Sequence, residues 1–145
     1  MTIIVNPIYL DYLFGTLSGL GDSEDDINVY GMYDTNNERQ TKTLARELLL
    51  PEFIKQNPLL VEQIKNSLAY YLLNPSIEFK DRIESLLLPF KTPDDGWLFF
   101  QWIWEVFFEG ESYDYLKDED VFEEFDINAP YKLLTGNQPP NTPSM

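Results

Sequence analysis

The sequence predicts an all-α fold, a compact bundle of about six to seven helices around a central aromatic helix. Three observations support this prediction. Apolar residues recur every three or four positions in several segments, as they do on the buried face of a helix. Four of these segments follow an Asn-Pro or Thr-Pro pair, in which Asn or Thr caps a helix and Pro fits its first turn. A chain of 145 residues is also long enough for one domain with a sizeable core.

In the N-terminal part, the sequence predicts one helix followed by one long connection. Residues 2–5 are either a short strand or a hydrophobic lead-in to the helix that Asn6-Pro7 begins. This helix should end near Gly21. Gly15 and Gly19 lie on one of its faces, where they either permit the close approach of another helix or only weaken the helix. Residues 21–37 are polar, and we expect them to lack regular structure.

The next helix should run from about residue 37 to residue 50, where Pro51 stops it. Arg39, Lys42 and Arg46 share one face of this helix, because they lie three and four positions apart. Such a basic stripe could bind an anion. A solvated face, or an internal partner for acidic residues elsewhere in the chain, is the favoured interpretation.

Two further helices are predicted from the same capping pattern. After a short turn of helix at 51–56, Asn57-Pro58 should begin a helix that runs to Leu73 with a clean apolar stripe. Asn74-Pro75 should begin the following one in the same way. We expect both helices to turn one face toward the core.

The segment Thr92–Gly110 holds the richest aromatic content of the chain, with all three tryptophans and four of the ten phenylalanines. Its apolar residues also alternate, as they would in a strand. The Thr-Pro start and a narrow polar stripe favour a helix over residues 93–109. A helix that is apolar on nearly all sides is normally buried, so this should be the central helix, with Trp97 and Phe108 at its wet edge.

The part that follows Gly110 is dominated by acidic residues. We expect one or two short helices there, with Val121, Phe122 and Phe125 on their inner face. Residues 1–127 should form a single helical domain. Residues 128–145 are rich in proline and should form a frayed tail.

The net charge of −15 is concentrated in two segments. Residues 105–126 contain ten acids and one lysine, and residues 22–26 contain four acids. This charge disfavours direct binding to nucleic acid or to an anionic membrane, and it favours a basic protein partner. Solubility, or adaptation to high salt, is the alternative explanation of the acidity.

The residues that catalysis most often uses are missing. The chain has no cysteine and no histidine, which excludes disulfides, thiol catalysis and Ser-His-Asp triads. It also has no glycine-rich phosphate loop and no spacing typical of metal ligands. We therefore expect a protein that is not an enzyme, that binds no cofactor or metal, and that is cytoplasmic, since the N-terminus lacks the basic region of a secretory signal. An enzyme that works with carboxylates alone is a remote alternative.

Small size, acidity, helical content and the lack of catalytic residues together resemble the small acidic immunity proteins of bacterial polymorphic toxin systems, such as those of contact-dependent growth inhibition. This resemblance implies a cognate toxin, often a basic nuclease, bound in a one-to-one complex. Phage-encoded inhibitors that mimic DNA share the same features. The alternative is a regulatory or structural helical module that joins a larger assembly through its aromatic surface.

Under the inhibitor hypothesis, the partner-binding residues are the acids of the two charged segments and the aromatic residues near them. They are Asp22, Glu24, Asp25, Asp26, Trp97, Phe108, Glu109, Glu111, Tyr113, Asp114, Tyr115, Asp118, Glu119, Asp120, Glu123 and Glu124.

Overall fold

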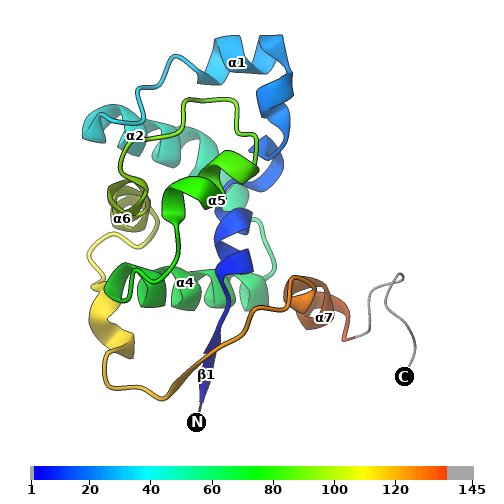
Figure 1. Cartoon of the computed structure of the whole chain (residues 1–145), viewed down its shortest axis with the longest axis vertical. Helices are drawn as coiled ribbons and strands as arrows, with labels where there is room; N and C mark the ends of the chain where they lie inside the picture. Colours follow the sequence, from blue (N-terminus) through cyan, green and yellow to red (C-terminus); the bar gives the residue numbers. More distant parts are fainter. Residues whose placement is uncertain (1, 137–145) are drawn as a thin grey trace.

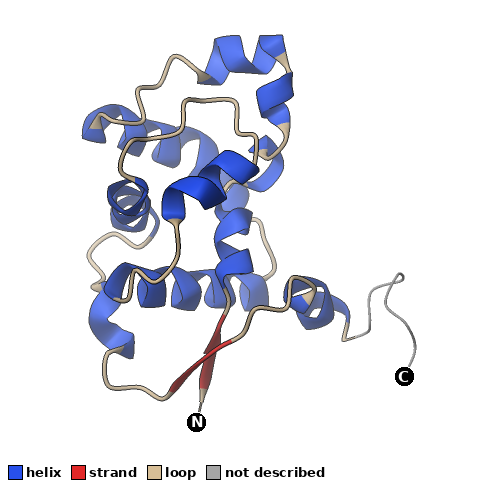
Figure 2. Cartoon of the chain, in the orientation of Figure 1, coloured by secondary structure: helices blue, strands red, loops and turns tan. Residues whose placement is uncertain are grey.

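The computed structural model describes residues 2–136 and confirms the predicted fold class. Seven α-helices, several shorter helical turns and one two-stranded sheet make up this part of the chain (Figures 1 and 2). None of the helices between residues 2 and 136 combines the length and the hydrophobicity of a membrane span.

The N-terminal strand is present, and its partner comes from the far end of the chain. Strand β1 (Ile3–Val5) pairs in parallel with strand β2 (Val121–Glu123). Ile3 lies opposite Val121, and Ile4 lies opposite Phe122. The prediction of a helix over residues 121–125 is therefore wrong, because the β-branched and aromatic side chains of β2 have a strand to pair with.

The segment after β1 forms three 3₁₀-helices in place of one α-helix: η1 (Pro7–Leu13), η2 (Gly15–Leu17) and η3 (Leu20–Asp22). Asn6 caps the first of them as predicted, since its side-chain oxygen accepts a 3.0 Å hydrogen bond from the amide of Ile8. Gly15 and Gly19 have φ values of 54° and 87°, in the left-handed region that glycine adopts most easily. The two glycines interrupt the helix.

Helix α1 (Glu24–Tyr30) lies in the region that was predicted to be irregular. Ser23 caps it, because its hydroxyl oxygen accepts a hydrogen bond from the amide of Asp26. Glu24, Asp25 and Asp26 occupy its first turn, where the helix dipole stabilises negative charge. Capping and dipole therefore suffice to form a short helix in a strongly polar segment.

The next helical stretch does not stop at Pro51. Helix α2 (Glu38–Leu44) continues through the π-helix η4 (Ala45–Leu49) into helix α3 (Leu50–Phe53). Pro51 lies in the first turn of α3, directly after the wider π-helical turns. Because it is a proline, it contributes no amide to the hydrogen-bond ladder of this continuous stretch.

Helix α4 (Pro58–Leu73) begins and ends as predicted, and Asn57 caps it through a 2.8 Å hydrogen bond from the amide of Leu59. Asn74 does not begin the next helix. Its side-chain amide donates a 3.1 Å hydrogen bond to the carbonyl of Tyr70 and so closes the end of α4. Helix α5 (Phe79–Ser85) starts five residues later in the chain than Asn74.

Helix α6 (Gly96–Phe107) is the predicted central helix, and it contacts α2, η4, α4 and α5. It begins at Asp95, whose carboxylate accepts a hydrogen bond from the amide of Leu98, and not at Thr92-Pro93. Phe99, Phe100 and Ile103 are completely buried. The aromatic helix therefore supplies much of the core.

The C-terminal part contains the 3₁₀-helix η5 (Tyr113–Leu116), β2 and helix α7 (Ala129–Thr135). The prediction of a frayed tail is wrong for residues 128–135, since Ala129 and Pro130 are buried and α7 contacts α4 and η1. Residues 137–145, the rest of the predicted tail, lie outside the described residues.

Candidate functional site

A groove of about 620 Å³ lies between the C-terminal part of α4 and the segment 114–121. Its lining is mostly polar and acidic: Tyr70, Leu73, Asn74, Asp114, Leu116, Lys117, Glu119, Asp120 and Val121. Three of the predicted partner-binding acids, Asp114, Glu119 and Asp120, thus meet around one hollow. A groove with three carboxylates and one lysine suits a cationic group of a binding partner.

The outer wall of this groove is held in place from both ends of η5. Ser112 caps η5 through a 3.3 Å hydrogen bond from the amide of Asp114, and its own hydroxyl donates to the carboxylate of Asp114 at 2.7 Å. The hydroxyl of Tyr115 donates a 2.6 Å hydrogen bond to the side-chain oxygen of Asn66 on α4. Leu116 is buried beneath them. The acidic wall is therefore fixed to the core.

The acids of residues 105–126 fall into two groups according to their ion pairs. Glu105 pairs with Lys42, Glu111 pairs with Lys65 and Asp126 pairs with Lys132, at 3.3, 2.6 and 2.7 Å. The remaining acids have no lysine or arginine nitrogen within 4.0 Å among the described residues. They are Glu109, Asp114, Asp118, Glu119, Asp120, Glu123 and Glu124.

The charge of the three paired acids is balanced within the chain, whereas that of the other acids is not balanced by a lysine or arginine of the described residues. Lys132 lowers the pKa of Asp126 through a side-chain hydrogen bond, and the amide of Asn128 lowers it further. Lys42, from the basic stripe of α2, also binds Glu38. This stripe is therefore in part an internal partner for acids, as predicted.

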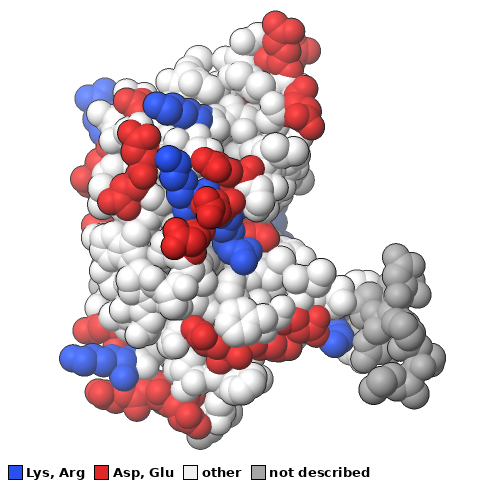
Figure 3. Space-filling view, viewed as in Figure 1, with Lys and Arg blue, Asp and Glu red and all other residues white. Residues whose placement is uncertain are grey.

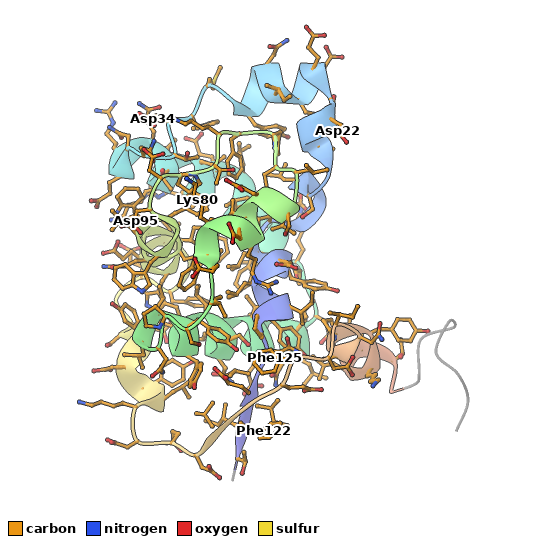
Figure 4. All side chains as sticks on the ribbon, viewed as in Figure 1. Asp22, Asp34, Lys80, Asp95, Phe122 and Phe125 are labelled. Atoms are coloured by element: carbon orange, nitrogen blue, oxygen red, sulfur yellow. The ribbon has the colours of Figure 1, made fainter. Side chains whose placement is uncertain are left out.

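The acids at residues 22–26 lie away from the groove. Figure 4 places Asp22 at one end of the long axis and Phe122 at the other. Figure 3 shows acidic side chains at both ends of the molecule. One contiguous surface around the groove therefore does not include the acids at 22–26, and the prediction that they join the C-terminal acids in one site is not supported by their positions.

The two aromatic residues that were predicted to lie at the wet edge of α6 are part of the fold. Phe108 is only 7% exposed and packs between Trp104 and Phe53, at centroid distances of 4.5 and 5.8 Å. Trp97 is half-buried, and its indole N–H donates a 3.0 Å hydrogen bond to the carbonyl of Leu72. The prediction that Phe108 is a contact residue is wrong, because its ring has no free face.

The two tyrosines of η5 are closer to the surface. Tyr113 is half-buried and meets the ring of Trp104 edge-on. Tyr115 is 41% exposed, and burial of its hydroxyl, with Glu111 and Glu62 nearby, raises its pKa. Both belong to η5, whose Asp114 lines the groove, so they remain aromatic candidates for contact with a partner.

A group of exposed apolar residues was not predicted from the sequence. Ile4 and Phe122 are 45% and 60% exposed, and Phe125 and Ile127 are 66% and 73% exposed. They lie on the two strands and on the segment that leads to α7. The alternation Val121-Phe122-Glu123 was the available signal, since it places Phe122 opposite to its neighbours in a strand.

The described residues contain no group of three acidic side chains arranged to hold a metal ion. No family model, curated protein or solved structure matches the chain.

Proposed function

We propose that this protein is an acidic inhibitor that binds and neutralises a basic partner protein by covering its active site. A nuclease-type bacterial toxin is the partner that the acidity fits best. The observation that supports the proposal is the gathering of Asp114, Glu119 and Asp120 around one groove, where no cation of the described residues pairs with them.

The physical basis is the match between fixed carboxylates and a surface that binds phosphates. A nuclease gathers lysine and arginine side chains to hold the nucleic-acid backbone. Carboxylates on a rigid wall can occupy the same positions, and a basic side chain of the partner can enter the groove. The negative field around the site also accelerates association, because it attracts the basic surface over several ångströms.

The acids at 22–26 have a smaller part in this proposal. They lie at the other end of the molecule, so they contribute to the long-range attraction and make no direct contact around the groove. This difference in position supplies a matched control for the experiment, since equal changes of charge can be made at the two ends.

A structural module of a larger assembly is the second candidate. The aromatic surface that was expected to bind such an assembly does not include Phe108, because Phe108 is buried. The exposed side chains of Phe122, Phe125 and Ile127 now favour it. Such an apolar contact should depend little on salt, and this property distinguishes the two candidates.

The test uses the purified chain and the basic proteins encoded by adjacent reading frames. We expect one of them to form a one-to-one complex whose association rate falls steeply as sodium chloride is raised. Reversal of three groove-side charges, by Asp118→Lys, Glu119→Lys and Asp120→Lys, should slow association by about tenfold or more.

The control reverses three charges at the other end, by Asp22→Lys, Glu24→Lys and Asp25→Lys. It changes the net charge equally, so it should slow association much less. Thermal unfolding of both variants shows that they remain folded. Equal effects of the two sets would contradict a groove-side interface, and a complex whose formation is insensitive to salt and to both sets would favour the assembly module.

A further inference from the structure

The two-stranded sheet has an outer face that nothing in the described chain covers. Side chains alternate along a strand, so Val5 points to the core and is completely buried, whereas Ile4 points outward. Phe122 is the Cα partner of Ile4 and also points outward. These two side chains are 45% and 60% exposed, and Figure 4 shows Phe122 at the end of the molecule, away from the core helices.

Strand β2 also has a free edge. The amide of Ile3 donates to the carbonyl of Asp120, and the amide of Glu124 donates to the carbonyl of Val5, both at 2.8 Å. In a parallel ladder with this register, Phe122 bonds to β1 through both its amide and its carbonyl. The main-chain groups of Val121 and Glu123 therefore point to the opposite edge, and no hydrogen bond from residues 2–136 reaches them.

The corresponding edge of β1 is closed by the fold. The amide of Asn6, which points away from β2, donates a 3.1 Å hydrogen bond to the hydroxyl of Ser67. Ser67 is on α4, and α4 packs along β1. Only the edge of β2 is therefore available to a further strand. Proteins usually cover or shorten such an edge, because it is a ready template for another chain.

Charge at the edge indicates what kind of chain can pair there. Asp118, Glu119 and Asp120 directly precede β2, and Glu124 directly follows it. None of them has a lysine or arginine partner among the described residues. A second copy of the chain would bring the same negative charges to the edge, which disfavours self-pairing. An extended segment with lysine or arginine residues is the complementary occupant.

We infer that β2 accepts an extended basic segment of the partner as a third strand of the sheet. The inference rests on the proposed function and assigns a mode of binding to it. Main-chain hydrogen bonds form at Val121 and Glu123, an apolar side chain of the segment packs beside Phe122, and a neighbouring basic side chain reaches the groove where β2 begins. Strand addition of this type draws its affinity from the main chain and its specificity from alternate side chains.

The first test uses a synthetic probe with the full-length chain. The probe is a nine-residue peptide of alternating lysine and valine, with blocked ends. We expect it to shift the amide resonances of residues 121–124 in NMR spectra, with an affinity that falls as salt is raised. A peptide N-methylated on the amides that face β2 should bind about tenfold more weakly, since each lost hydrogen bond is worth about 1 kcal/mol. Equal binding of both peptides would overturn the inference.

The second test uses variants of the chain. Val121→Pro removes an edge amide that β1 does not use, and a proline is tolerated at the first residue of a strand. Its control, Val121→Ala, shortens the side chain and keeps the amide. We expect the proline variant to bind the peptide about fivefold more weakly than the alanine variant, since one hydrogen bond is lost. Retention of the Ile3–Asp120 pairing in the NMR spectra shows that the sheet is intact.

Binding of the basic protein partner to the two Val121 variants distinguishes this inference from the proposed function. A partner that binds with a steep salt dependence, and equally well to the Val121→Pro and Val121→Ala variants, would leave the proposed function standing and overturn strand addition. Selective loss of binding by the Val121→Pro variant would support both. Dimerisation of the chain alone, abolished by Val121→Pro, would show that a second copy occupies the edge and would overturn the inference.

Discussion

The indole N–H of Trp104 donates a 2.8 Å hydrogen bond to the main-chain carbonyl of Glu111. Trp104 is 2% exposed and belongs to the core helix α6, whereas Glu111 is the first acid after Gly110, in the part that leads to η5 and β2. The side chain of Glu111 also binds Lys65 on α4, at 2.6 Å. The buried aromatic helix thus holds Glu111 in place.

Replacement of Trp104 by phenylalanine should loosen the acidic segment. Trp104→Phe keeps an aromatic ring but removes the donor to Glu111 and leaves space around the smaller ring. We expect the free energy of unfolding to fall by about 2–4 kcal/mol. Amide hydrogen exchange should become faster at residues 111–117 than in α4. The matched control is Trp97→Phe, which removes the bond to Leu72 and should leave exchange at residues 111–117 unchanged.

The side chain of Asn6 joins the start of η1 to the distant Asp126, so its replacement should affect the C-terminal part selectively. Its side-chain amide donates a 2.9 Å hydrogen bond to the carbonyl of Asp126, and its oxygen caps η1. Asn6 is 1% exposed. We expect Asn6→Ala to lower the free energy of unfolding by about 2–3 kcal/mol, because buried polar groups lose their partners.

Hydrogen exchange at β2 and α7 checks this effect, since both should open before α6 does. Asn57→Ala is the control, because Asn57 is an exposed cap of α4. It should cost about 1 kcal/mol and should not release β2. Equal opening of all elements in the Asn6→Ala variant would contradict a local role for Asn6.

The parts of the fold that could be predicted from the sequence are those that local signals determine. Asn57-Pro58 and the apolar stripe after it define α4, and no distant contact changes that helix. Asn74-Pro75 gives the same local signal, yet Asn74 closes α4 through the carbonyl of Tyr70. An Asn-Pro pair directly after a long helix can either cap the last carbonyls of that helix or begin a new helix. The sequence alone does not distinguish these two uses.

The strand β2 and the edge that it offers depend on a contact between residues about 118 positions apart. Val121, Phe122 and Phe125 suit a short amphipathic helix as well as a strand, and only the pairing with Ile3–Val5 decides between them. Local pattern therefore predicted where the acids are but not the exposed face of Phe122. The exposure of Phe108 was also predicted wrongly because of distant contacts. Phe53 of α3 and Lys65 of α4 cover the side of α6 that was expected to face solvent.

Gly96 allows α5 and α6 to approach closely, and a methyl group there should destabilise the fold. A Cβ atom at this position would lie 2.7 Å from the Cβ of Phe79 and 2.8 Å from the amide nitrogen of Lys80. We expect Gly96→Ala to lower the free energy of unfolding by about 1–3 kcal/mol, as overpacking does. Chemical denaturation measures it. Asp81→Ala, a change on the exposed face of α5, should stay within about 0.5 kcal/mol of the parent. A Gly96→Ala variant as stable as the parent would show that the two helices can separate without cost.

Buried tyrosines should make the fold sensitive to alkali. Burial, with the charge of Glu124 nearby, raises the pKa of Tyr9 from 10.0 to about 12. Burial also raises the pKa of Tyr71, whose hydroxyl has no hydrogen-bond partner among the described residues. A raised pKa means that the unfolded chain loses these protons at a lower pH than the folded chain. Stability is therefore fully present below pH 10 and is lost as the pH rises toward 12.

Replacement of these tyrosines by phenylalanine should remove part of that loss. Tyr71→Phe should leave stability at neutral pH unchanged or higher, because no hydrogen bond is lost with the hydroxyl. Between pH 10 and 12, both Tyr9→Phe and Tyr71→Phe should unfold at a higher pH than the parent chain. Tyr131→Phe is the control, since Tyr131 is 39% exposed and should not shift the midpoint. Circular dichroism across the alkaline range follows the unfolding, and midpoints equal to that of the parent would show that another group controls it.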